Sequence, residues 1–275
     1  MLTVNLGPLS MPIAVILVLV ALLIAAGAGL LAGRAQKTGI GHILTDMLLA
    51  GVLVARAAFV AIWFDAYRIA PWSMLDIRDG GFSPWVGMAA ALLVAIWHGW
   101  RTAAVRKPLA LGLAAGALVW GGTFTAISMM QNATLPTVPL TTLAGEPADL
   151  TRLAAGKPLL VNMWATWCPP CRRELPTLAA AQKQEAGVRF VFVDQGEDAR
   201  TVQRYLSAAS LELDNVLLDA GARMGREVGS GGLPTTLFYD TKGRLVDTHV
   251  GQLTAGSLAS KLDRLRSRSG LTNKE

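Results

Sequence analysis

The sequence is poor in cysteine and histidine, with two cysteines, Cys168 and Cys171, and three histidines in 275 residues. A chain without a third cysteine can exchange two electrons with a partner, but it cannot relay them across a membrane through its own thiols. His249 is the only histidine after residue 131, so cysteine and histidine cannot complete a four-ligand zinc site there. A purely structural disulfide is disfavoured because the bridge closes a very short loop. The pair therefore indicates reversible thiol chemistry, with no metal and no other cofactor.

Acidic residues are scarce in the first half of the chain. Residues 1–131 hold 4 of the 19 Asp and Glu residues and 8 of the 25 Lys and Arg residues, whereas the rest is nearly balanced. The basic excess lies in short segments between apolar runs, where it sets membrane orientation and gives no footprint for nucleic acid. We therefore expect a transmembrane helical domain at residues 1–131 and a soluble domain at residues 132–275.

Long uncharged runs dominate the first half. Residues 12–32 carry no charge, and at about 1.5 Å per residue such a helix crosses a hydrocarbon core of roughly 30 Å. A cleaved signal peptide is the alternative, but no basic residue precedes this run, and it is longer than a usual signal core. Further runs at about 43–64, 84–100 and 109–127 predict four spans in all.

The charges between the runs predict which side of the membrane each loop faces. Basic residues prevail in the first and third loops, whereas acidic residues outnumber basic ones in the second. The positive-inside rule then places loops one and three in the cytoplasm. Everything after residue 131 is expected in the periplasm of a bacterial inner-membrane protein, away from the cytosolic thiol-reducing pools.

Ionisable and aromatic residues in this half allow two interpretations. Arg56 and Asp46 lie within or near the second run, where charge is costly and indicates function by default. Alternatively, Asp46 lies at the interface and Arg56 pairs with a neighbouring helix. Tryptophans near the ends of the runs are typical of an interfacial belt: Trp63, Trp72, Trp85, Trp97, Trp100 and Trp120.

The first half also resembles a lipid-modifying family. The segment Leu-Gly-Pro-Leu-Ser at 6–10, Arg56 with Phe59, and the run at 74–83 containing Asp-Gly-Gly-Phe-Ser are similar to the N-terminal half of prolipoprotein diacylglyceryl transferases. That family follows the Gly-Gly run with a histidine important for transfer, and Trp85 stands in its place here. The resemblance implies a reused, degenerate membrane scaffold that contacts membrane lipid. A lipid-binding or lipoprotein-modifying protein with a redox appendage is the alternative.

After residue 135 the pattern alternates between strand-like and helix-like segments, which predicts an α/β fold with a central sheet. Strands are expected at 159–164, 188–194, 235–239 and 245–250. Helices are expected at 169–184, 199–209, 222–228 and 253–265. Pro176 is expected to kink the first of these helices.

The two cysteines lie between a buried strand and a helix. Cys168 at the helix start is favoured as a thiolate by unpaired N–H groups and the helix dipole. Pro169 and Pro170 have no N–H, so the Cys171 amide is the nearest donor within the motif. We expect Cys168 to attack and a buried Cys171 to resolve the mixed disulfide.

A second part of the site is expected at Leu233-Pro234, which follows two glycines and precedes a strand. This context favours a cis proline packed against the disulfide, with a trans proline opening an edge strand as the alternative. The Leu233 backbone would then bind an extended segment of a client protein. We expect Trp167, Pro169, Leu233 and Pro234 to form the substrate-binding surface.

The soluble half resembles the membrane-anchored TlpA-like thioredoxins, which include reductases of cytochrome c maturation. The resemblance covers about residues 135–268 and includes the run Val-Asn-Met-Trp-Ala-Thr-Trp-Cys-Pro-Pro-Cys at 161–171. It implies a thioredoxin-like fold that acts as a protein disulfide reductase. Asn162 stands where ordinary thioredoxins carry a buried aspartate, and Glu174 is a candidate for that acid role. An acid merely favoured by the helix dipole is an equal alternative.

The direction of electron flow stays open between a reductase and a thiol oxidase, because Pro-Pro between the cysteines does not by itself set a potential. A chaperone is a third hypothesis. Since the chain has no thiol in its membrane half, a separate transmembrane electron donor, DsbD-type or similar, is expected to supply electrons. Periplasmic proteins with thiols or disulfides are the expected clients.

Overall fold

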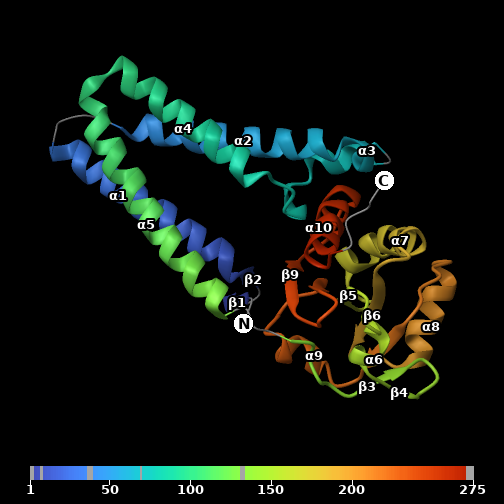
Figure 1. Ribbon diagram of the computed structural model, residues 1–275. Coiled ribbons are helices and arrows are strands. Elements are labelled where there is room, and N and C mark those ends of the chain that lie inside the picture. The colour runs from blue at the N-terminus through green and yellow to red at the C-terminus, as the bar shows by residue number, and fades with distance from the viewer. Residues whose placement is uncertain (1–2, 7–8, 36–39, 69, 131–133, 271–275) are drawn as a thin grey trace. The chain divides into compact units, whose positions relative to one another are not determined.

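The computed structural model describes residues 3–6, 9–35, 40–68, 70–130 and 134–270 (Figure 1). The chain divides into two compact units. Ile13–Met130 forms a helical unit, and the described residues before and after it belong to an α/β unit. A short hairpin of β1 (Thr3–Leu6) and β2 (Leu9–Pro12) precedes the helical unit.

Within the described residues, the helical unit has four long helices: α1 (Ile13–Ala35), α2 (Gly41–Ile62), α4 (Pro84–Arg101) and α5 (Arg106–Met130). The shorter elements are α3 (Phe64–Tyr67) and the 3-10 helices η1 (Pro71–Leu75), η2 (Ile77–Asp79) and η3 (Ala103–Val105). Helix α1 packs along α5, and α2 packs along α4 (Figure 1).

Glycines allow close helix packing in this unit. A Cβ on Gly87 of α4 would lie 2.7 Å from the carbonyl oxygen of Gly51 in α2. A Cβ on Gly112 of α5 would lie 2.9 Å from the carbonyl oxygen of Ala25 in α1. Small residues at such crossings let backbones approach closely, which is how helices associate where no water is excluded.

The four long helices cover the four ranges in which the sequence predicts membrane spans. In the described parts of the chain, Gly41–Ile62 and Ala103–Gly122 are long and apolar enough to cross a membrane, and Leu23–Gly33 is a shorter apolar stretch. A membrane crossing by all four helices stays a prediction.

The α/β unit is built on a seven-stranded sheet among the described residues. In sheet order its strands are β4 (Pro147–Ala148), β3 (Leu140–Thr142), β7 (Val216–Asp219), β6 (Arg189–Gln195), β5 (Leu159–Trp164), β8 (Thr235–Tyr239) and β9 (Leu245–Val250). The three central strands β7, β6 and β5 run parallel, whereas β3, β8 and β9 pair antiparallel with their neighbours. The central strands therefore end together at one edge of the sheet.

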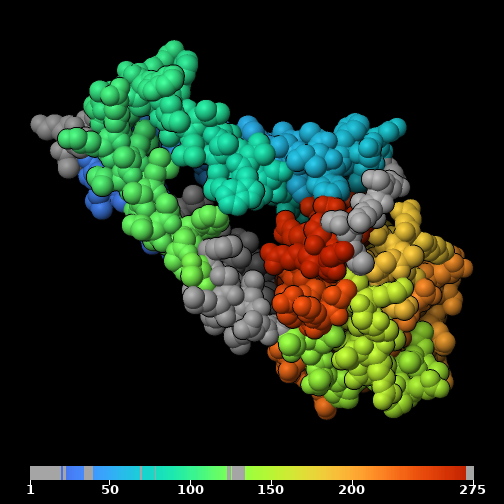
Figure 2. All heavy atoms as spheres, in the orientation of Figure 1, coloured from blue at the N-terminus to red at the C-terminus, as the bar shows by residue number. Residues whose placement is uncertain are grey.

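Helices cover both faces of this sheet, and two apolar cores fill the layers between them. In the space-filling view of Figure 2, the red atoms of the C-terminal residues, which include α10, lie at the surface of this unit. Leu160 and Trp164 of β5 join an apolar core with α7 (Pro169–Gln184), α8 (Ala199–Ala208) and α10 (Ala255–Arg268). The alternate residues of β5 face a second core with α6 (Leu150–Ala154) and α9 (Arg223–Glu227). A strand buried on both faces reads as a near-continuous apolar run, and β5 can be predicted from the sequence because Asn162 is its only polar residue.

The sequence predicts β5, α7, β8 and β9 with the bounds observed and misses β3, β4, β7 and α6. Strand β7 has four residues, too few for periodicity to reveal, and its pairing with β6 defines it. Helix α10 begins at Ala255, two residues later than predicted. The Thr254 hydroxyl accepts a hydrogen bond from the Ser257 N–H, and the Ser257 hydroxyl accepts one from the Thr254 N–H, so a capping box sets this start.

Candidate redox site

The two cysteines lie at the start of α7, just after β5 ends. Cys168 is the N-cap residue and forms a disulfide bond with Cys171, with their Cα atoms 5.3 Å apart. The Cys171 N–H donates to the Cys168 sulfur at 3.3 Å. Pro169 and Pro170 occupy the first two helical positions and have no N–H to offer. After reduction, this donor and the helix dipole would stabilise a thiolate on Cys168.

The two sulfur-bearing residues differ in access. Cys171 is fully buried, and Cys168 keeps 3 % of its surface exposed. The adjacent Trp167 is 66 % exposed, and Pro169 is also exposed. The surface next to Cys168 is therefore open to a partner at Trp167 and Pro169, and an attacking Cys168 with a resolving Cys171 stays a prediction.

The predicted proline loop lies at the same edge of the sheet. The Leu233–Pro234 peptide bond is cis, as the sequence predicts. Strand β8 begins at Thr235, which pairs with Met163 of β5, so Pro234 is level with the last residue of β5. Leu233 is half-buried between the two apolar cores. The fold thus brings Pro234 close to the segment that leads into Cys168, and the client-binding role of this loop stays a prediction.

Glu174 lies one helical turn beyond Cys171 and is fully buried. Its Oε1 accepts a hydrogen bond from Asn162 Nδ2 at 2.7 Å, and its Oε2 accepts one from the Leu253 N–H at 2.8 Å. Burial raises the pKa of Glu174 to about 7, although both hydrogen bonds oppose this by favouring the carboxylate. An acid merely favoured by the helix dipole would lie exposed on the helix surface, and Glu174 does not.

A carboxylate that sequence reasoning missed supports the loop before Cys168. Glu197 accepts two hydrogen bonds from Thr166, one from the backbone N–H at 2.6 Å and one from the hydroxyl at 2.5 Å. The Glu197 N–H in turn donates to Asp194 at the end of β6. Burial, and then the neighbouring Glu197, raise the pKa of Asp194 to about 8. Thr166 and Glu197 are 31 residues apart, and only the parallel pairing of β5 with β6 brings them together.

Comparisons with known proteins place this site in a family. A family model described as Redoxin matches residues 130–265. Over 143 residues the chain is 33% identical to the Thioredoxin-like protein YneN of Bacillus subtilis (strain 168), covering 50% of this chain and 81% of that protein. It is 31% identical over 152 residues to the Thiol:disulfide interchange protein HelX of Rhodobacter capsulatus, covering 50% and 84%. The chain belongs to the thioredoxin-like thiol-disulfide oxidoreductases.

The chain is also similar to a solved structure. The thiol:disulfide interchange protein of the thioredoxin family from Chlorobium tepidum TLS is 27% identical, with a TM-score of 0.43, covering 49% of this chain and 96% of that one. The family match begins at residue 130, so it concerns the α/β unit of this oxidoreductase. The resemblance of the helical unit to diacylglyceryl transferases stays a prediction.

Two arginines of this thioredoxin-like unit border a shallow depression beside the disulfide. The depression has a volume of about 340 Å³ and is lined by Pro169, Arg172, Arg173 and Tyr205. The Arg172 guanidinium carbon lies 5.4 Å from the centre of the Tyr205 ring. Arg173 Nε donates to the Gln252 side-chain oxygen at 2.9 Å. The sequence indicates only a basic pair on an exposed turn here. The fold places two partners beside this pair: Tyr205 of α8 next to Arg172, and Gln252 of the loop before α10 next to Arg173.

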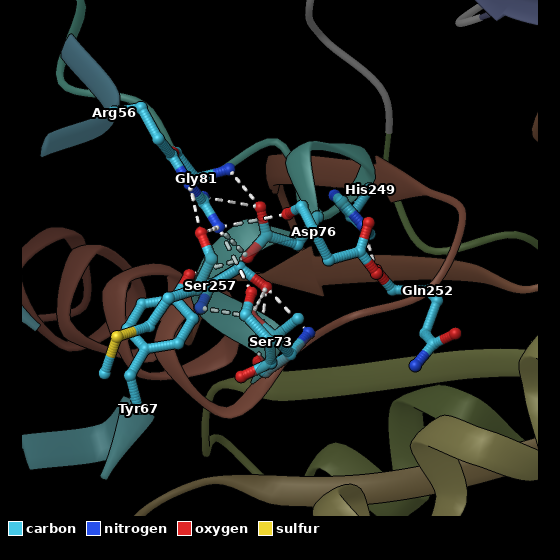
Figure 3. Close-up of polar contacts among 11 residues, drawn as sticks. Arg56, Tyr67, Ser73, Asp76, Gly81, His249, Gln252 and Ser257 are labelled. Atoms are coloured by element: carbon cyan, nitrogen blue, oxygen red, sulfur yellow. Dashed lines mark hydrogen bonds and ion pairs between the residues drawn. The ribbon is translucent and has the colours of Figure 1, made fainter. Parts of the chain in front are cut away.

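In the described part of this oxidoreductase, no group of three or more His, Cys, Asp or Glu side chains is placed to hold a metal ion. His249 Nε2 instead lies 3.3 Å from the Gln252 carbonyl oxygen (Figure 3).

The helical unit contains a separate polar cluster around Arg56 (Figure 3). Arg56 pairs with the buried Asp79 at 2.8 Å and donates to the Gly81 carbonyl oxygen at 2.7 Å. It also donates to backbone carbonyl oxygens of residues 73, 74 and 76. The Tyr67 hydroxyl donates to the second oxygen of Asp79 at 2.6 Å. Arg56 therefore ties the connection between α3 and α4 to α2, which agrees with the structural interpretation of this residue.

The same cluster explains one glycine of the Gly-Gly run. A Cβ on Gly81 would lie 2.6 Å from an Arg56 guanidinium nitrogen and 2.6 Å from the Phe59 ring. Gly81 thus leaves room for the ion pair. Asp46 lies apart from the cluster, 3.7 Å from His98 Nε2, with half of its side chain exposed.

Proposed function

We propose that this oxidoreductase reduces disulfides in periplasmic client proteins, in cytochrome c maturation or a related process, by Cys168 attack and Cys171 resolution. The observation that carries the proposal is the disulfide at the start of α7, in which the Cys171 N–H points at the Cys168 sulfur. That arrangement favours a thiolate on Cys168, which lies between the exposed Trp167 and Pro169, and leaves Cys171 fully buried.

The reaction moves two electrons in two displacements. The Cys168 thiolate attacks one sulfur of the client disulfide, which forms a mixed disulfide and releases one client thiolate. Cys171 then loses its proton and attacks Cys168, which closes the protein disulfide and releases the second client thiolate. The client gains two electrons and the Cys168–Cys171 pair loses two.

Glu174 serves as the proton acceptor in the second displacement. It lies one helical turn from Cys171, so the two side chains share a face of α7. A pKa of about 7 keeps both of its protonation states populated near neutral pH, which suits a group that accepts and returns a proton.

Client recognition is assigned to the surface around Cys168. Trp167 and Pro169 are exposed beside the attacking residue, and Leu233-Pro234 lies at the same sheet edge. The Leu233 backbone would pair with an extended client segment and hold its disulfide against Cys168.

Residues 1–131 are proposed to anchor the oxidoreductase in the bacterial inner membrane through four spans, as a degenerate diacylglyceryl-transferase-like scaffold in contact with membrane lipid. Residues 132–275 then form the periplasmic thioredoxin-like domain. The four helices at the predicted ranges and the charges of the loops support this arrangement. Because both cysteines lie in the α/β unit, a separate transmembrane dithiol donor, DsbD-type or similar, must regenerate the reduced pair.

The direction of electron flow is tested by thiol alkylation in cells that are quenched with acid. We expect the Cys168–Cys171 pair to be mainly reduced when the membrane donor is intact and oxidised when the donor is deleted. A pair that stays oxidised with the donor intact would identify a thiol oxidase and overturn the reductase proposal.

Clients are identified with a Cys171→Ala variant. It should retain mixed disulfides on Cys168, and mass spectrometry of the captured proteins would name the clients. The matched Cys168→Ser variant should capture none and should be inactive. Retained activity in Cys168→Ser would favour a chaperone role that needs no thiol.

The topology is tested with alkaline phosphatase fusions, which are active only outside the cytoplasm. Fusions after Lys37 or Lys107 should be inactive, and fusions after Arg78 or Thr134 should be active. The opposite pattern would reject the orientation. Rescue of a strain without its diacylglyceryl transferase by residues 1–131 would contradict the scaffold role.

A further inference from the structure

Two exposed arginines border the depression beside the disulfide, and each makes one side-chain contact. Arg172 is held against the Tyr205 ring, and Arg173 is held by the Gln252 side chain. An arginine restrained in this way loses less conformational entropy when it binds an anion than a free side chain does. Pro169, the residue after Cys168, forms part of the same depression.

These two charges have no acidic partner among the described residues. Among the other arginines of the same unit, Arg244, Arg264 and Arg266 each contact an Asp or Glu side chain. No such pair joins Arg172 or Arg173 to a carboxylate in the residues that the structure describes. The Nη atoms of Arg173 and the guanidinium of Arg172 are therefore available to an external group.

We propose that this depression receives acidic side chains of the client protein, next to the cysteines that react with Cys168. The proposal rests on the proposed function and names the class of client that the site prefers. A guanidinium matches a carboxylate with two parallel hydrogen bonds, and two guanidiniums around one depression favour a segment with more than one carboxylate. Because Pro169 directly follows Cys168 and also lines the depression, the residues that flank a client's cysteines would lie near the two arginines.

The two arginines could change the rate of reduction for all clients, and this effect must be separated from a preference for acidic clients. Positive charge near the disulfide also favours the Cys168 thiolate, which changes the rate for every client. Selection changes the ratio of the rates for an acidic and a neutral client. The ratio is therefore the quantity to measure.

The experiment uses the full-length protein in detergent micelles, reduced before mixing. Two peptides with one internal disulfide serve as probes, and they differ only in carrying Glu or Gln on either side of each cysteine. The second-order rate constant for reduction of each peptide is measured by stopped-flow tryptophan fluorescence. The variants are Arg172→Gln, Arg173→Gln and the double variant. Arg152→Gln is the charge-matched control, because Arg152 is exposed on α6 before the start of β5, whereas the depression lies beyond the end of β5.

We expect the unchanged protein to reduce the Glu peptide about fivefold faster than the Gln peptide at low salt, and this preference to fall as salt screens the charges. Each single variant should lose part of the preference and the double variant most of it, while Arg152→Gln keeps it. Continued reduction of the Gln peptide shows that a variant is folded.

A preference that persists in the double variant, or one that Arg152→Gln loses equally, would overturn the proposal. Equal rates for both peptides with the unchanged protein would overturn it while leaving the reductase function standing. Reduction of neither peptide would count against the proposed function itself, and the inference would fall with it.

Discussion

Glu174 should make the stability of the α/β unit depend on pH. Its carboxyl ionises near 4.5 in an unfolded chain, and burial raises the pKa to about 7 in the folded protein. Between these values the folded protein keeps a proton that the unfolded chain releases, so the unfolding free energy falls as pH rises. The contribution is complete below pH 4.5 and is lost once the pH has passed through about 7. At about 1.4 kcal/mol per pH unit, this interval amounts to about 3 kcal/mol.

The assay is urea unfolding of the oxidised full-length protein in detergent, followed by tryptophan fluorescence, from about pH 4 to about pH 8. Glu174→Gln is neutral throughout, so its unfolding free energy should fall by about 3 kcal/mol less than that of the unchanged protein over this range. Glu227→Gln, at an exposed position on α9, should follow the unchanged protein. Subtracting the two curves also removes the contribution of Asp194, whose raised pKa acts in the same direction. Parallel curves for Glu174→Gln and the unchanged protein would refute a buried, protonated Glu174.

Three further substitutions test the contacts described above. Glu197→Gln removes the charge that accepts both Thr166 hydrogen bonds, so urea unfolding should show a loss of about 1–3 kcal/mol and reduced Cys168 should alkylate at a different rate. Unchanged stability and alkylation would show that this contact does not support the loop. Gly81→Ala places a Cβ against Arg56 and should lower stability by about 1–3 kcal/mol in a thermal melt, whereas Gly27→Ala faces open space and should change little. Equal melts for both would contradict the close packing at Gly81. Thr254→Val removes the side-chain cap of α10 and should lower the free energy of unfolding in urea by about 1 kcal/mol. An unchanged free energy of unfolding would show that the Thr254–Ser257 capping box does not stabilise the unit.

The parts that the sequence predicts well are those with short-range signals. Strand β5 is an apolar run interrupted only by Asn162, and Cys-Pro-Pro-Cys follows its end after three intervening residues. The strand, the helix start and the cysteine pair can therefore all be predicted from 13 residues, 159–171. The glycines before Leu233-Pro234 predict the cis bond in the same way. Strand β7 and the Glu197 contact are not predictable locally, because pairing with a strand distant in the chain creates them.

The helical unit shows the same limit. Arg56 in an apolar run indicates either function or a structural pair, and nothing nearby in the sequence decides between them. The structure places the Arg56 guanidinium among Asp79 and several carbonyl oxygens of a segment 17 to 25 residues away. The carbonyl oxygens belong to the backbone, so the types of the residues that carry them give no sign of these hydrogen bonds in the sequence. The hydrogen bonds of Arg56 to these carbonyl oxygens are therefore seen only in the folded structure.

The sequence by itself determines the chemistry available to this oxidoreductase: one pair of thiols, which exchanges two electrons, with two prolines between them that have no N–H. These properties follow from residue identity and spacing, which folding does not alter. The tertiary structure alone decides which acid is shielded from water, which arginines surround a depression, and which carboxylate supports the loop before Cys168. Such properties depend on which groups exclude solvent from one another, and distance along the chain does not specify that.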